Sequence, residues 1–187
     1  MLEKYRTQFS AFIKEKKLEP MVDVAMFILI TLAIHFSYRF WAAHQYFPIQ
    51  GVMSSMHEFL SDALFKQSSW IIQHVLGMDI TTVKRTMYWQ NQGYIAISHG
   101  CSGLKQIIQF VLLMMFFPGP WKRKLWYLPL GALIVHFTNI FRIVGLAVVL
   151  VSVPDYWKFS HDYLFRPFFY VVIFSLWVYW VEKLKKK

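Results

Sequence analysis

The chain has 187 residues, of which 57% are hydrophobic, 19% aromatic and only 16% charged. This composition is too apolar for an ordinary soluble domain and predicts an integral membrane protein with one domain over residues 1–187. The net charge of +10 does not indicate nucleic acid as a partner, because the basic residues cluster beside apolar segments, at 14–17, 122–124 and 183–187. Such clusters orient a protein in the bilayer and have anionic lipid as their counter-charge.

The predicted elements begin with a short basic cytoplasmic segment over residues 1–20. The apolar run over 21–47 exceeds the roughly 20 residues that a helix needs to cross a bilayer, and we interpret it as a retained transmembrane helix rather than a signal peptide. Three more apolar segments lie at 102–117, 125–151 and 163–181. The sequence therefore predicts an all-α polytopic membrane protein with about four transmembrane helices.

The basic clusters also predict the orientation of these helices. The cluster at 122–124 and the C-terminal lysines should both stay in the cytoplasm, and four spans with both termini inside satisfy this condition. The chain then divides into an outer segment over 48–100 and a three-span core over 101–183. These features predict a multi-pass protein of the inner, cytoplasmic membrane.

Two elements are expected within the outer segment. Residues 53–76 mix apolar with charged side chains, which is typical of an amphipathic helix lying in the membrane interface; a re-entrant pair of helices is the alternative there. Residues 81–98 carry β-branched and aromatic side chains on both sides of a turn-like sequence at 91–93. This pattern predicts a small outer β-hairpin.

Three reactive groups are expected at one depth in the membrane. Cys101, the only cysteine, precedes the span over 102–117 and lies at its outer boundary. Arg142 lies about 18 residues past the cytoplasmic start of the next helix, roughly 27 Å at 1.5 Å per residue, close to the far side of a 30 Å core. His161 precedes the last span at the same outer level. An equal depth in the membrane does not show whether the three residues lie side by side.

The chemistry of the three groups suits a covalent reaction. The positive end of a helix and Lys105, four residues on, would favour the thiolate of Cys101, which is the competent nucleophile. Arg142 can stabilise an oxyanion, and His161 can exchange protons with a leaving amine and an incoming nucleophile. His99, Lys105 and Asn139 are interpreted as supporting residues.

Each group also has a structural interpretation. A lone cysteine can be a packing residue or a lipidation site, and Arg142 can snorkel to the headgroups. His161 can belong to a loop-to-helix cap that contains an Asp162–Arg166 pair. The conjunction of the three groups favours catalysis. His136 and Asn139 share a helix face with Arg142 and are interpreted as hydrogen-bonded support. His35, His44, His57 and His74 show no metal-ligand spacing, so no metal and no cofactor is predicted.

Three short motifs carry a resemblance to a known family. Cys-Ser-Gly-Leu-Lys at 101–105, Asn-Ile-Phe-Arg-Ile at 139–143 and His-Asp at 161–162, each at the edge of a span, resemble the motifs of the exosortase/archaeosortase family. The family's catalytic cysteine, arginine and histidine fall on Cys101, Arg142 and His161. The family's usual arginine at the end of the first motif is replaced by Lys105, which keeps the charge but loses the bidentate fork.

The resemblance implies an activity and partners. Members are membrane cysteine transpeptidases that cleave the C-terminal sorting signal of a membrane-anchored, exported protein and transfer that protein to a cell-surface acceptor, a polysaccharide or a lipid. The site would then lie at the outer face of the membrane. The alternative is a non-enzymatic scaffold or transport component in which Arg142, Asn139 and His136 line a polar path.

Overall fold

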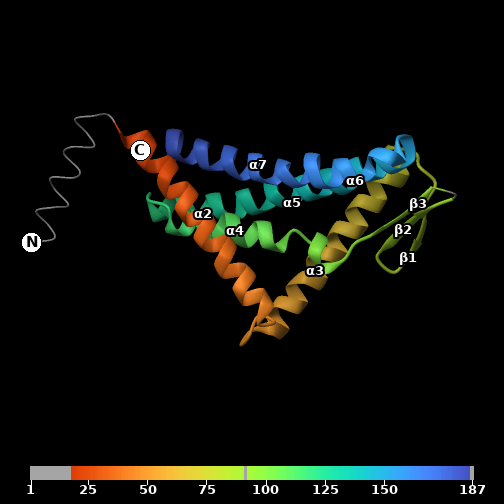
Figure 1. Cartoon of the computed structure of the whole chain (residues 1–187), viewed down its shortest axis with the longest axis horizontal. Coiled ribbons are helices and arrows are strands. Elements are labelled where there is room, and N and C mark those ends of the chain that lie inside the picture. Colours follow the sequence, from red (N-terminus) through yellow and green to blue (C-terminus); the bar gives the residue numbers. More distant parts are fainter. Residues whose placement is uncertain (1–17, 91, 186–187) are drawn as a thin grey trace, which may run out of the picture.

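A computed structural model describes residues 18–90 and 92–185 of the chain. Residues 1–17 of the predicted cytoplasmic segment, and Asn91 in the predicted turn, lie outside the described residues. Helices dominate the fold, which confirms the predicted all-α class: α2 (Glu19–Ala43), α3 (Gln50–Trp70), α4 (Leu104–Phe116), α5 (Trp121–Ser152), α6 (Trp157–Phe159) and α7 (Arg166–Tyr179) (Figure 1).

In the described part of the chain, three helical segments are long and apolar enough to cross a membrane. They are α2, α5 and the continuous stretch Pro154–Leu184, which contains α6 and α7. The remaining predicted span is α4, whose 13 residues extend about 20 Å at 1.5 Å per residue. Each predicted span is thus a helix, one of them short, and the protein is a multi-pass membrane protein.

The transmembrane core forms where α4, α5 and α7 pack together. Its buried side chains include the large aromatics Phe110, Tyr127 and Trp180. Gly131 on α5 makes this packing close, because a Cβ added there would lie 2.1 Å from the Phe110 ring. The absence of a side chain at Gly131 therefore lets α4 lie directly against α5, which fixes the start of α4 relative to α5.

Helix α3 lies oblique to α5 (Figure 1). It runs from the end of α2 to the far end of α5 (Figure 1), and continues through one π-helical turn, Ile71–Val75. Its buried residues Met53, His57, Ser61 and Leu64 recur every three or four positions and pack toward α5 and the start of α4. The predicted amphipathic helix is present, and its position relative to the bilayer stays a prediction.

The outer segment also contains a three-stranded antiparallel sheet of β1 (Thr81–Val83), β2 (Thr86–Trp89) and β3 (Gly93–Ala96), in that order. The predicted hairpin corresponds to β2 and β3, which pair from Thr86↔Ala96 to Trp89↔Gly93. Strand β1 adds to it through a tight turn in which Lys84 has φ of +53°. The hairpin prediction missed β1, because the turn at Lys84-Arg85 carries none of the usual Gly, Asn or Asp signals.

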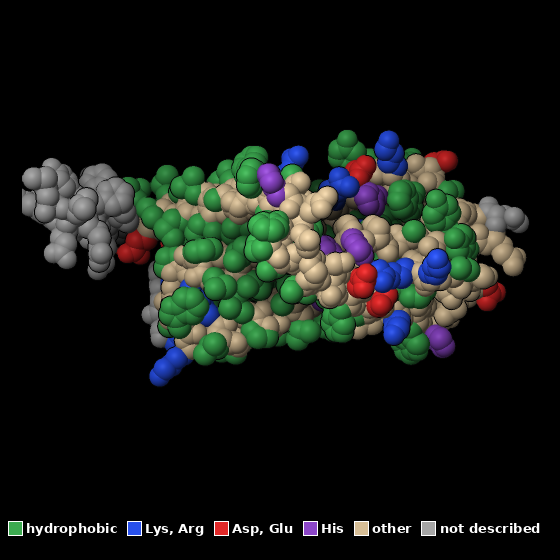
Figure 2. Space-filling view, turned by 90° about the horizontal axis from the view of Figure 1, so that it is seen from below, with side chains coloured by type: hydrophobic (Ala, Val, Ile, Leu, Met, Phe, Trp, Pro, Cys, Tyr) green, Lys and Arg blue, Asp and Glu red, His purple; other side chains and the backbone are tan. Residues whose placement is uncertain are grey.

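Side-chain chemistry divides the molecule along its long axis. Figure 2 shows hydrophobic side chains covering the half that contains α2 and the C-terminal end of α7, while charged and histidine side chains gather over the half that contains α3 and the sheet. Cys101 lies in the short segment before α4 that packs against α3, Arg142 lies on α5, and His161 lies in the turn before α7.

Candidate active site

Cys101 closes a short turn just before α4. The turn is a 3₁₀ helix, His99–Cys101, in which the Cys101 N–H donates to the Ser98 carbonyl at 2.9 Å and the Ser98 hydroxyl lies 3.7 Å from Sγ. Helix α4 begins three residues later than Cys101, at Leu104, so the cysteine precedes the helix rather than opening it. The side chain of Cys101 is partly exposed, as a nucleophile must be.

Asn139 fixes this turn from α5. Its side chain is fully buried, and Nδ2 donates to the Cys101 carbonyl at 2.7 Å. Gly103 leaves room for this hydrogen bond, because a Cβ at this position would lie 2.7 Å from Asn139 Nδ2. Its φ of +80° also favours glycine. The structure therefore brings Asn139 and the backbone of Cys101 together across 38 residues of sequence.

Arg142 lies one helical turn beyond Asn139 and reaches the thiol. Its side chain is only 8% exposed, interacts with the Cys101 side chain and lies 5.8 Å from the Phe169 ring centroid. Its Nε is buried and has no hydrogen-bond partner among the described residues. A snorkelling arginine would extend its guanidinium into the headgroups. Arg142 is instead buried, interacts with Cys101 and keeps an Nε–H donor that is unpartnered within the described part of the chain.

His161 lies in a π-helical turn, Ser160–Phe165, before α7. Its Nδ1 is 2.8 Å from Asp162 Oδ1, its ring stacks on Trp157 at 5.3 Å, and Asp162 also pairs with Arg166 at 3.2 Å. Trp157 and Cys101 both border the same hydrophobic cluster. The contacts described for His161 do not include Cys101 or Arg142. The neighbouring Asp162 pairs with Arg166, which is an electrostatic neighbour of Arg142.

A comparison with protein families identifies the family of the chain. The family model described as transmembrane exosortase (Exosortase_EpsH) matches residues 21–181. The chain belongs to the transmembrane exosortase family. The match confirms the resemblance carried by the three motifs and extends it to α2, α3 and the sheet. No curated protein and no solved structure matches the chain. Membership suggests a membrane transpeptidase that acts on sorting signals.

The other two predicted supporting residues of this exosortase lie on different sides of the turn. His99 stacks on His57 of α3, with ring centroids 5.5 Å apart. Lys105 Nζ lies 5.9 Å from the ring centroid of Tyr38 on α2. Within residues 18–90 and 92–185, no group of three or more His, Cys, Asp and Glu side chains is arranged to hold a metal ion.

His57 is a site residue that the sequence prediction missed. It is 93% buried (7% exposed), and its Nδ1 is hydrogen-bonded at 2.9 Å to the hydroxyl of Ser102, the residue after the nucleophile. Ser102 Oγ in turn accepts the Leu104 N–H at 3.3 Å. Burial lowers the pKa of His57, and the neighbouring His99 lowers it further. His57 was excluded as a metal ligand by its spacing, while its position on the apolar face of the amphipathic helix was the available signal.

Proposed function

We propose that this exosortase is a cysteine transpeptidase or peptidase that cleaves a peptide bond near the membrane anchor of an exported protein. The observation that supports this most directly is the buried Arg142, whose side chain interacts with that of Cys101 and whose Nε has no hydrogen-bond partner among the described residues. A permanent cation that interacts with a cysteine favours the thiolate and provides a donor for a developing oxyanion.

The proposed reaction has two steps. The Cys101 thiolate attacks the carbonyl carbon, Arg142 stabilises the resulting oxyanion, and the C–N bond breaks as His161 gives a proton to the leaving amine. A thioester remains on Cys101. An acceptor amine or water then attacks the thioester, His161 takes its proton, and the thiolate leaves. The hydrogen bond from His161 Nδ1 to Asp162 would leave Nε2 to exchange these protons.

The polar-path alternative receives less support from the same residues. His136 Nε2 is hydrogen-bonded to Gln67 Oε1 at 2.7 Å, and Asn139 binds the Cys101 carbonyl at 2.7 Å. Both side chains thus connect α5 to neighbouring elements. Such contacts suit residues that hold a site in place better than residues that line an open route.

The proposal includes a location and partners. The basic clusters support an inner-membrane protein with the Cys101 site at the outer face, where an exported, membrane-anchored substrate with a C-terminal sorting signal would arrive. A surface polysaccharide or lipid with a nucleophilic group would serve as the acceptor.

Co-expression tests the proposed activity. The full chain is produced together with candidate exported proteins that end in an apolar helix and a short tail, and each candidate carries an epitope before the helix. We expect a shortened, epitope-bearing product that depends on the exosortase, measured by immunoblot and by mass spectrometry of its new C-terminus. If every candidate exported protein keeps its full length when it is produced together with the exosortase, the proposal is contradicted.

His57 is expected to act as a positioning residue in this reaction. Loss of its bond to Ser102 leaves a buried hydroxyl without its partner, which costs about 1–3 kcal/mol. We therefore expect His57→Ala to slow substrate processing by about 10- to 100-fold. His57→Asn should recover part of the rate, because an asparagine amide can occupy the place of Nδ1. Initial rates of product formation measure both effects.

His74→Ala is the matched control, because His74 is exposed and its Nδ1 binds the Trp70 carbonyl of its own helix. This variant should process substrate at the wild-type rate. Full activity in His57→Ala, or an Asn variant no faster than the Ala variant, would remove the positioning role.

A further inference from the structure

Away from the Cys101 site, an apolar groove of about 620 Å³ lies between α2 and α4. Both walls follow the helical repeat, with residues four positions apart facing the groove. The residues that define it are Ile30, Ile34 and Tyr38 on α2 and Ile108, Leu112 and Phe116 on α4. The groove therefore runs along the two helices as a narrow hydrocarbon-lined channel, open on one side.

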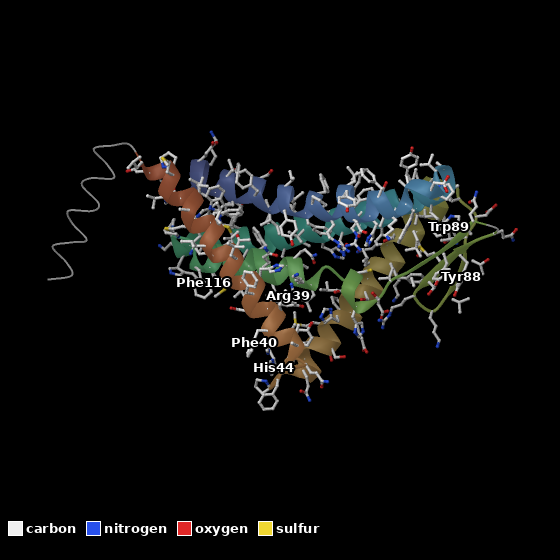
Figure 3. All side chains as sticks on the ribbon, in the orientation of Figure 1. Arg39, Phe40, His44, Tyr88, Trp89 and Phe116 are labelled. Carbon is white, nitrogen blue, oxygen red and sulfur yellow. The ribbon has the colours of Figure 1, made fainter. Side chains whose placement is uncertain are left out.

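One end of the groove is basic. Lys105 lies on the same face of α4 as Ile108, one turn earlier, and its Nζ is 5.9 Å from the ring centroid of the groove residue Tyr38. Arg39 follows Tyr38, is exposed, and is an electrostatic neighbour of Lys105. Figure 3 shows Arg39 near the start of α4 and Phe116 at its other end. The groove is thus cationic at one end and apolar along the rest.

Among the described residues, no acidic side chain pairs with the positive charge at this end of the groove. Neither Lys105 nor Arg39 belongs to an ion pair within the described part of the chain, and nearby Arg166 is the partner of Asp162. The N-terminus of α4 adds the positive end of its dipole. Like charges gathered beside apolar walls repel one another unless an anion joins them.

The dimensions favour a single chain over a protein helix. From Lys105 to Phe116 the groove extends about 16 Å at 1.5 Å per residue. A helix of that length and about 10 Å in diameter fills roughly 1,300 Å³, twice the volume of the groove. A single extended hydrocarbon chain is narrower than a helix and can follow the groove over this length.

We propose that this groove binds an anionic phospholipid, with the phosphate between Lys105 and Arg39 and one acyl chain between α2 and α4. The site shares Lys105 with the predicted surroundings of Cys101, but lipid binding does not depend on the proposed cysteine chemistry. In the predicted orientation, the start of α4 lies at the outer face of the membrane. The phosphate would therefore lie at the outer face, beside Lys105, and the acyl chain would extend along α4 toward the middle of the bilayer.

Lipid titration of the purified full chain in detergent tests the proposal, with binding measured by native mass spectrometry. Phosphatidylglycerol should bind more tightly than diacylglycerol with the same chains, and than glycerol 3-phosphate. The double variant R39Q/K105Q should weaken phosphatidylglycerol binding by about 25-fold, about fivefold for each charge. Ala33→Trp, which fills the groove without changing charge, should also weaken it.

Two controls match these variants. K66Q/K84Q removes two exposed lysines that do not line the groove, and Leu32→Trp adds the same bulk on an exposed position of α2; both should bind phosphatidylglycerol like the wild type. Unchanged affinity in a folded R39Q/K105Q protein would overturn the proposal. Equal binding of diacylglycerol or of glycerol 3-phosphate would do the same, as would binding of an apolar transmembrane peptide where phosphatidylglycerol fails to bind.

Discussion

Replacing Cys101 with alanine should abolish processing of a substrate, with a fall in rate of roughly 10⁴-fold or more, because a covalent reaction has no route without its nucleophile. The thiol is partly exposed, so its loss removes little packing, and the variant should insert and accumulate normally. Product formation in the co-expression assay measures the effect.

Ser98→Ala is a suitable control for this variant. Ser98 lies in the same turn, and its hydroxyl makes only a long contact of 3.7 Å with Sγ, so most of the activity should remain. A stably inserted Cys101→Ala protein that still yields processed product would show that the reaction does not use a thioester, and the proposed function would fail.

Arg142 should show the second large effect. Removal of one preorganised oxyanion donor costs about 2.7–4 kcal/mol, so Arg142→Ala should lower the processing rate by about 10²- to 10³-fold. Arg142→Lys should retain a little activity, because a lysine keeps the charge but not the planar set of donors. Rates of product formation for the two variants, compared at equal protein level, test this expectation.

The matched control for Arg142 is Arg85→Ala. Arg85 is a surface arginine whose Nε binds Asp62 at 2.6 Å, and an exposed pair of this kind contributes little. Near-normal turnover is expected. Near-normal turnover in both Arg142 variants as well would assign Arg142 a structural role, and the proposed oxyanion site would have to be abandoned.

The sequence predicts the transmembrane part of this fold well, because length and apolarity determine a span. The runs at 21–47 and 125–151 are helices in the structure. Strand β1 was missed, because a three-residue strand closed by Lys84-Arg85 has too few residues for a pattern. A short strand whose turn lacks Gly or Asn forms because it pairs with a neighbouring strand. This pairing cannot be predicted from the residues of the short strand alone.

The sequence could predict the depth of the candidate site residues in the membrane, but it could not predict which of their side chains are in contact. Counting helical rise placed Cys101 and Arg142 at one level, whereas their approach depends on the fit of Gly103 against Asn139. His57 lies on the buried face of α3, which the helical repeat could have indicated, but its bond to Ser102 joins residues 45 positions apart. The repeat indicates burial, whereas the partner of a long-range hydrogen bond depends on how α3 packs.

The π-helical turn at Ser160–Phe165 affects two features of this segment: the direction of the His161 side chain and the face of α7 that is buried in the core. In a regular helix, one of these features would determine the other. A π turn holds one more residue than an α turn, and one residue corresponds to about 100° of rotation. Without this extra residue, His161 would emerge about a quarter-turn away around the axis while Phe169 and Trp177 kept their places in the core. The π-helical turn therefore sets the direction of the His161 imidazole independently of the face of α7 that packs in the core.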